Sequence, residues 1–355
     1  NDQFIMHLSR LCLMIADHHY SSLTKDGRVC GEENYPLFAN TTRIKGSSPT
    51  LNQHLDEHLL GVESVAGKVS HMLPTLVSKL PRLAKHRKLK QRSKTEQFRW
   101  QDTAADKALV ISQDTQENGA FVVNMASTGC GKTLANARIM YALSDKNKGW
   151  RCAFALGLRT LTKQTGKEYR QKLGLSDEDV AILVGGYETD ALQNILSKIA
   201  ELTGSESSQD LFPEDGYVIY DGAVESETYI STIFAKDNAR KLLSAPILSC
   251  TIDHLVPATE GTRGGRQIAP MLRLLSGDLV LDELDDYDIL DLPAVSRLVN
   301  WAGLLGCRVL ISSATLPPSI VTGMFDAYQA GRKSFNRNRA QSERCLLYTS
   351  PSPRD

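Results

Sequence analysis

Residues 126–133, Ala-Ser-Thr-Gly-Cys-Gly-Lys-Thr, constrain this chain more than any other stretch. They follow an apolar run, FVVNM, typical of a strand, and precede TLANARIMYAL, which has a helical pattern. Glycines let backbone N–H groups turn inward around a phosphate, and the positive end of the following helix faces the same anion. Lys132 can neutralise phosphate charge, and the Thr133 hydroxyl can bind Mg²⁺. The sequence therefore predicts a nucleotide-phosphate loop that uses Ser127, Thr128, Gly129, Cys130, Gly131, Lys132 and Thr133.

Composition narrows the class of protein. The 355 residues leave room for two domains. The 41 basic and 41 acidic residues cancel, so any affinity for nucleic acid must come from a local surface. The seven cysteines are scattered without a CxxC pair, which favours reduced thiols and a cytoplasmic location. No apolar run approaches the ~20 residues of a membrane span, so we expect no membrane partner.

The hydrophobic pattern predicts an α/β fold with a parallel sheet. After residue 95, short apolar runs alternate with helical ones, and strands are expected at 121–125, 152–156, 181–184, 247–250, 278–281 and 308–312. Residues 1–95 have helical periodicity and no convincing strand. We therefore expect a helical region with a basic linker at 1–95, an ATP-binding domain at 96–335 and a tail at 336–355.

The two ends have the appearance of cuts. The chain opens at Asn1 directly in a helical pattern, as though entered in the middle of a domain. From about Cys345 the sequence has no periodicity that links it to the preceding residues. This segment reads either as a native disordered tail or as foreign sequence. The second interpretation is favoured, and no function is expected there.

An acidic pair supplies the second element of nucleotide chemistry. Asp282 and Glu283 follow the apolar strand DLVL. An aspartate at a strand end can hold Mg²⁺, and the adjacent glutamate can orient the attacking water. The alternative is an acidic loop, because the run continues through Asp286 and Asp288. The order of a phosphate loop and then this pair favours the catalytic assignment of Lys132, Asp282 and Glu283.

Four further segments fit a motor that acts on nucleic acid. Phe98 can pack on adenine and the Gln101 amide can read its edge, although a buried aromatic at a helix start is an equal alternative. The turns at 158–165 and 251–255 carry hydroxyl, amide and arginine groups suited to phosphates, and either could equally be helix capping. Residues 313–315 close another strand, although small hydroxyl residues are common at strand ends. The nucleic-acid and coupling residues are expected to be Arg159, Thr160, Gln164, Thr251, Ser313, Ala314 and Thr315.

Residues 82–94, RLAKHRKLKQRSK, form a basic run. A solvated helix surface or a linker that happens to be basic is the commoner explanation of such a run. Contact with nucleic acid is the alternative.

Taken together, these phrases carry a family resemblance. The form AxTGxGKT is the one that superfamily 2 helicases use. With ALGLRTLTKQTG, ILVGG, TIDHL, LDELDD and WAGLLGCRVLISSATLPP, it resembles the CRISPR-associated helicase-nuclease of type I-F systems over residues 98–332. The resemblance implies a RecA-like first helicase domain after an HD nuclease domain. It also implies ATP and Mg²⁺, single-stranded DNA, an RNA-guided type I surveillance complex and adaptation proteins as partners, and the unwinding and degradation of foreign DNA.

The same resemblance extends weakly into the N-terminal region. Ala16-Asp17-His18-His19 is similar to the segment that supplies the last metal-ligating aspartate of the HD nuclease, which makes Asp17 a ligand for a divalent transition metal. His54 and His58 have i,i+4 spacing, but exposed helix residues are the commoner case. One aspartate cannot hold a two-metal centre, so we expect no nuclease activity from this chain.

The motor is also expected to be incomplete. No second strand–helix series with an arginine-bearing helicase motif follows Thr315. An arginine finger contributes about 10³–10⁵ in turnover, so nucleotide binding with weak hydrolysis is expected. Two alternatives remain, another superfamily 2 helicase or translocase and a non-catalytic ATP-binding adaptor.

Overall fold

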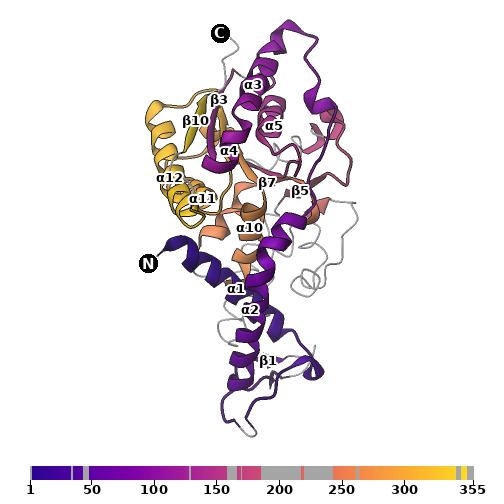
Figure 1. Cartoon of the computed structure of the whole chain (residues 1–355), viewed down its shortest axis with the longest axis vertical. Helices are drawn as coiled ribbons and strands as arrows, with labels where there is room; N and C mark the ends of the chain where they lie inside the picture. Colours follow the sequence, from indigo (N-terminus) through magenta and orange to yellow (C-terminus); the bar gives the residue numbers. More distant parts are fainter. Residues whose placement is uncertain are drawn as a thin grey trace.

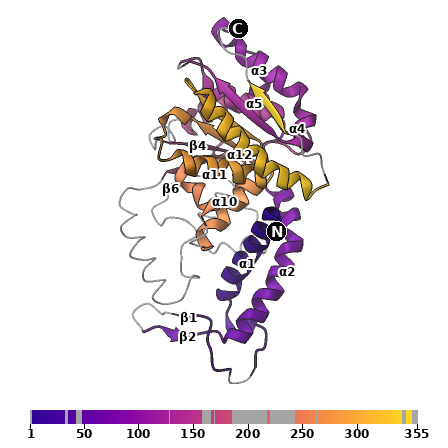
Figure 2. The same cartoon turned by 90° about the vertical axis from the view of Figure 1, so that its left-hand side faces the viewer.

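The computed structural model describes residues 2–32, 35–42, 48–127, 129–157, 166–168, 170–184, 217–219, 243–260, 264–340 and 345–349. A helical pair extends along the long axis away from an α/β part (Figures 1 and 2). The pair consists of α1 (Gln3–Ser21) and α2 (Leu55–Lys79). The segment between them carries two antiparallel strands, β1 (Thr41–Thr42) and β2 (Thr50–Leu51). The expectation of no strand there was wrong, because two-residue strands are too short to show a period of two.

One large sheet forms the centre of the α/β part. All neighbouring strands run parallel except the edge pair β5 and β6, and the order is β10-β3-β9-β8-β4-β7-β5-β6. The α/β class with a parallel sheet is confirmed, and each of the six expected strands is present within one residue of its expected bounds. The strands are β3 (Ala120–Met125), β4 (Cys152–Leu156), β5 (Val180–Val184), β6 (Tyr217–Ile219), β7 (Ile247–Thr251), β8 (Asp278–Asp282), β9 (Val309–Ser313) and β10 (Leu346–Thr349).

The region expected to be a tail is partly ordered. Helix α12 (Pro318–Arg337) extends past residue 336, and residues Leu346–Thr349 pair in parallel with β3 as strand β10. The Tyr348 side chain is buried, and its hydroxyl donates to the backbone oxygen of Ala104 at 2.9 Å. The alternative of a disordered tail was therefore wrong for these residues, and the interpretation as foreign sequence stays a prediction. The free edge of β3 offers backbone partners to any short apolar segment, which periodicity within the segment cannot reveal.

Helices cover both faces of the sheet, and alternate strand residues point to opposite faces. In β3, Phe121 and Val123 join the core beneath α10 to α12, whereas Ala120 and Val122 join the core beneath α3 and α5. Figure 1 shows the two helical layers on either side of the strands. The helices are α3 (Arg99–Val110), α4 (Ser112–Asn118), α5 (Lys132–Leu143), α10 (Gly264–Ser276), α11 (Leu292–Leu304) and α12 (Pro318–Arg337).

The helical pair shares a core with the α/β part. Leu11 and Ile15 of α1 and Leu73 of α2 belong to the same buried cluster as α10, α11 and α12. Short 3-10 turns connect many elements, at Lys25–Gly27, Lys88–Lys90, Glu96–Phe98, Ile252–His254, Val256–Thr259 and Leu284–Asp286. Among the described residues, no helix is both long and apolar enough to cross a membrane.

Two glycines allow α11 and α12 to pack closely. A Cβ atom at Gly331 would collide with the backbone oxygen of Asn300, and one at Gly303 would collide with the backbone oxygen of Tyr328. Backbone atoms cannot rotate away as side chains can, so any side chain here forces the helices apart.

We expect Gly331→Ala to lower the free energy of unfolding by about 1–3 kcal/mol, because the added methyl group overpacks this contact. Gly323 lies in the same helix with open space around its Cα, so Gly323→Ala is the matched control and should be neutral or stabilising by about 0.5–1 kcal/mol. Urea denaturation of both variants measures the difference. Equal effects of the two substitutions would contradict the close-packing assignment.

Candidate nucleotide-binding site

The loop between β3 and α5 has a backbone that requires glycine. Gly129 and Gly131 have φ angles of 84° and 76°, in the left-handed region that other residues avoid. Gly131 caps the amino end of α5, and the Cys130 N–H donates to the Ser127 oxygen at 3.2 Å. The loop therefore turns tightly and places the N-terminus of a helix at its centre, as the sequence predicted. Thr128 lies outside the described residues.

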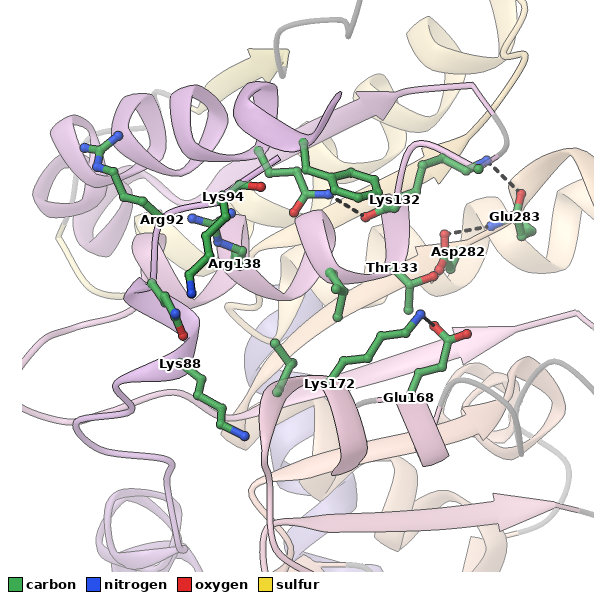
Figure 3. Close-up of a pocket in the computed structure, with 18 of the residues that line it drawn as sticks. Lys88, Arg92, Lys94, Lys132, Thr133, Arg138, Glu168, Lys172, Asp282 and Glu283 are labelled. Atoms are coloured by element: carbon green, nitrogen blue, oxygen red, sulfur yellow. Dashed lines mark hydrogen bonds and ion pairs between the residues drawn. The ribbon is translucent and has the colours of Figure 1, made fainter. Parts of the chain in front are cut away.

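Lys132 and Glu283 meet at this loop. The Lys132 Nζ donates to Glu283 Oε2 at 3.0 Å, and the Lys132 side chain is only 5% exposed. Glu283 itself has a φ of 54°, which is a strained backbone for a residue with a side chain. Strain at this position is consistent with a functional constraint on the direction of the carboxylate. Figure 3 shows the two side chains pointing toward each other.

Asp282 is buried beside this ion pair. Asn136 of α5 donates to Asp282 Oδ1 at 3.1 Å, and Asn124 of β3 donates to the Asn136 oxygen at 2.6 Å. Burial raises the pKa of Asp282 to about 6, and a hydrogen bond with Ser312 opposes that shift. A buried carboxylate with a raised pKa at the end of a strand is a candidate ligand for a hard cation.

Phe98 and Gln101 adjoin the loop. Gln101 Nε2 donates to the backbone oxygens of Cys130 and Gly131, both at 3.3 Å. A Cβ at Gly131 would lie 3.3 Å from Phe98 Cε1, so the aromatic ring also abuts the loop. The structure thus brings Phe98 and Gln101 next to the loop, although they are about thirty residues away in sequence.

All of these groups share one cleft of about 820 Å³. Figure 3 shows Lys132, Thr133, Asp282 and Glu283 at one end and Lys88, Arg92 and Lys94 at the other. The cleft is lined by Lys88, Gln91, Arg92, Ser93, Lys94, Phe98, Gln101, Gly129, Gly131, Lys132, Thr133, Leu134, Arg138, Leu156, Glu168, Lys172, Leu173, Asp282 and Glu283. Its size and its polar groups suit a nucleotide-sized ligand.

The expected coupling residues that the structure describes, Thr251, Ser313, Ala314 and Thr315, do not line this cleft. The Ser313 Oγ accepts from the Thr315 N–H at 3.1 Å, and Thr315 Oγ1 donates to Asp285 Oδ2 at 3.3 Å. Ala314 lies between them, and this turn therefore contacts the acidic segment that follows Glu283. Thr251 ends β7, and its hydroxyl lies 2.8 Å from His254 Nδ1. Arg159, Thr160 and Gln164 lie outside the described residues.

Sequence reasoning missed two polar groups that support the site. Asn136 shares a helix face with Lys132, and the i,i+4 spacing of these residues was the available signal. The Arg138 Nη2 donates to Asp102 Oδ1 at 2.5 Å in a pair that is less than a tenth exposed. This ion pair ties α3, which carries Gln101, to the helix that begins at Lys132. No local pattern indicates such a long-range pair.

Asp17 lies in the helical pair, far from the cleft in the fold. The His58 Nε2 is 2.8 Å from Asp17 Oδ1, and the His58 Nδ1 is 2.9 Å from Gln53 Oε1. His58 is buried, so its interpretation as an exposed helix residue was wrong: the packing of α2 on α1 covers it. The described residues contain no group of three or more His, Cys, Asp or Glu side chains arranged to hold a metal ion. Asp17 as a metal ligand stays a prediction.

Because the pKa of Asp282 is raised in the folded protein, the free energy of unfolding should depend on pH. Because the folded state holds this proton more tightly than the unfolded state, the free energy of unfolding should fall as pH rises from about 4 to about 6. The shift corresponds to about 3 kcal/mol. We expect Asp282→Asn to be more stable than the parent by up to that amount above about pH 6, and similar at about pH 4. Urea denaturation across this pH range checks it.

Asp278 provides a matched control on the same strand. It forms a buried ion pair with Arg308, with Arg308 Nη2 2.7 Å from Asp278 Oδ2. Asp278→Asn leaves a buried guanidinium without its partner and should destabilise the protein by about 3–5 kcal/mol at neutral pH. If Asp282→Asn and Asp278→Asn destabilise the protein to the same extent at neutral pH, burial of the ionised Asp282 carboxylate does not lower the free energy of unfolding as expected.

Comparisons with known proteins identify the family of the chain. Residues 88–241 match the family described as the res subunit of type III restriction enzymes. The chain is 54% identical to the CRISPR-associated nuclease/helicase Cas3 of subtype I-F/YPEST from Pseudomonas aeruginosa over 339 residues, which is 96% of this chain. It is 48% identical to the protein of the same description from Pectobacterium atrosepticum over 95% of this chain.

A comparison of three-dimensional structures also gave a match. The crystal structure of T. fusca Cas3 with ADP covers 81% of this chain and 29% of its own, at 17% identity and a TM-score of 0.49. The chain spans about 31% of the length of each of the two curated relatives. At 54% and 48% identity over nearly its whole length, the chain belongs to the family of CRISPR-associated nuclease/helicases of subtype I-F.

Proposed function

We propose that the chain is the ATP-binding motor portion of a helicase-nuclease that unwinds and degrades foreign DNA. The observation that carries this proposal is the meeting of Lys132, Asp282 and Glu283 beside a loop with two left-handed glycines. Their order along the chain and their position at the carboxyl ends of β3 and β8 are those of a nucleoside triphosphate site in a parallel sheet. The curated relatives are described as nuclease/helicases, which supports the same class.

Each residue of the cleft receives a role from its position. The N–H groups of residues 127–133 and the Lys132 ammonium hold the β- and γ-phosphates. Thr133 and Asp282 hold Mg²⁺, which neutralises phosphate charge when bound. Glu283 orients the attacking water. Phe98 packs on the adenine ring and Gln101 hydrogen-bonds to its edge.

The donor set fits Mg²⁺ on the evidence of the structure. Asp282 is almost completely buried, yet its pKa of about 6 leaves it ionised at neutral pH. An ionised carboxylate that opens onto a cleft of this size is stabilised when a cation replaces the water that burial removed. The oxygen ligands of Thr133 and Asp282 are those that Mg²⁺ prefers.

The turn at Ser313, Ala314 and Thr315 couples the nucleotide site to a single-stranded DNA. Its support is the hydrogen bond from Thr315 to Asp285, because the acidic segment begins directly after Glu283. A movement of Glu283 on nucleotide binding therefore reaches this turn through one hydrogen bond. Thr251, with Arg159, Thr160 and Gln164, would hold phosphates of the strand without reading sequence.

The whole protein would act with an RNA-guided type I surveillance complex and with adaptation proteins. The two curated relatives are described as CRISPR-associated, which supports a partner of this class. Asp17, paired with His58, would contribute one ligand to a divalent transition metal of the nuclease domain. These assignments concern the complete protein, of which this chain spans about 31% in its relatives.

We expect Lys132→Ala to weaken ATP binding by about 10²-fold, because the phosphates lose a charge-assisted contact in a buried position. Isothermal titration with ATP and Mg²⁺ measures the binding. Lys146→Ala, at an exposed lysine outside the cleft, is the matched control and should bind like the parent.

Glu283→Gln tests the catalytic role separately. In the complete protein it should retain ATP binding and lower DNA-stimulated hydrolysis by about 10²–10⁴-fold, since the amide cannot accept a proton from the attacking water. Phosphate release gives the rate. Turnover like that of the parent in either Lys132→Ala or Glu283→Gln would refute the assigned roles.

A further inference from the structure

The basic run at residues 82–94 forms an exposed, positively charged surface. It carries seven cationic side chains and no carboxylate. We call residues 85–94 the basic strip. Its six Lys and Arg residues are exposed, in a chain whose formal net charge is zero. They are Lys85, Arg87, Lys88, Lys90, Arg92 and Lys94.

The amino end of the strip is fixed to the α/β part. Leu83 and Trp150 exchange two backbone hydrogen bonds of 2.7 and 2.8 Å. The Tyr141 hydroxyl of α5 accepts from the His86 N–H at 2.8 Å and donates to the Ala84 oxygen at 2.9 Å. Leu89, in the middle of the strip, is only 2% exposed. These contacts fix the strip on the surface of the α/β part, so it is not a free linker.

The carboxyl end of the strip is held by a buried ion pair. The Ser93 N–H donates to both carboxylate oxygens of Asp102, at 3.2 and 3.0 Å. Asp102 in turn pairs with Arg138 of α5. The position of the strip is thereby coupled to the two helices that carry Gln101 and Lys132.

The charges of the strip are poorly compensated within the chain. Among the described residues, its single ion pair is that of Arg92 with Asp106, at 2.8 Å and largely exposed. Carboxylates on the neighbouring segment pair elsewhere: Glu168 with Lys172 and Asp177 with Arg170. The Debye length is about 8 Å at physiological ionic strength, so cations on adjacent residues repel each other. A fold that fixes them together is stabilised by a polyanion.

The chemistry of the strip favours a phosphate backbone over an acidic protein. Its exposed groups are ammonium and guanidinium ions and the Gln91 amide, while its leucine points inward. Protein interfaces need buried apolar or aromatic anchors, and the strip offers none. Lysines act as point charges that grip phosphates without reading bases. Figure 3 shows Lys88, Arg92 and Lys94 on the wall of the nucleotide cleft.

We propose that the basic strip binds the phosphate backbone of a nucleic-acid strand that runs along the mouth of the nucleotide cleft. This surface does not include Thr251 or the turn at residues 313–315, and its binding does not require nucleotide. Lys88, Arg92 and Lys94 belong to both the strip and the cleft, so the strand would lie next to the nucleotide.

The test replaces Lys85, Arg87, Lys88 and Lys90 together with glutamine. Fluorescence anisotropy with labelled single-stranded DNA, duplex DNA and RNA of equal length gives affinities across a sodium chloride series. The slope of log K against log salt should become shallower by about 0.7 for each phosphate of a single strand that the variant no longer neutralises, and by about 0.9 for each phosphate of a duplex. The nucleic acid with the largest change in slope identifies the strand that the strip binds.

A second quadruple variant removes the same charge elsewhere. Lys25, Lys68, Lys146 and Lys333 are exposed and lie outside both the strip and the cleft. Their replacement by glutamine should leave the slope close to that of the parent. Equal slopes in the two quadruple variants overturn the proposal, as does the absence of binding to all three nucleic acids by the parent chain. Urea denaturation of both variants confirms that each is folded.

Two further outcomes separate this proposal from others. Lys132→Ala should keep the parental salt slope while losing ATP binding, so failure of the nucleotide site and failure of the strip are distinguishable. If the strip variant binds every nucleic acid like the parent but loses affinity for the surveillance complex, the strip is a protein-docking surface and the proposal is wrong.

Discussion

The burial of both faces of one parallel sheet is the constraint on which the rest of the structure depends. Strands β3, β4, β7, β8 and β9 are covered by helices on either side, so nearly every side chain along them must be apolar. Polar chemistry is then confined to the ends of strands and to the turns that follow. The phosphate loop, Asp282 and the Ser313 turn all occupy such places. The same burial raises the pKa of Asp282, because water is excluded from its carboxylate.

The sequence was a good guide to whatever depends on short-range pattern. Six strands were predictable because each is a brief, continuous apolar run between turn signals, and the loop was predictable because only glycine tolerates φ angles such as those of Gly129 and Gly131. Strand β10 was not predictable, since its partner β3 lies more than two hundred residues earlier. The burial of His58 was also not predictable, because it depends on how α2 packs against α1.

The supporting residues of the site show the same division. Lys132, Asp282 and Glu283 follow from spacing, but the Asp102–Arg138 ion pair joins helices whose proximity is a property of the fold. The basic strip was visible in the sequence as a run of charge. The hydrogen bonds with Tyr141, Trp150 and Asp102 that fix its position were not visible there. Long-range contacts thus decide whether a charged run is a solvated linker or a preformed surface.

The ion pair between Lys132 and Glu283 has a consequence for how the site changes state. In this structure the lysine that would receive phosphate already has a built-in anion, held 3.0 Å away on a strained backbone. Under the proposed function, an arriving triphosphate would compete with that internal ligand, and the exchange would release the carboxylate when the substrate occupies the loop. The Glu283 carboxylate would then stay paired with Lys132 until a phosphate takes its place. With the proposed roles, the empty site would be self-inhibited, and the inhibiting carboxylate would become the catalytic group.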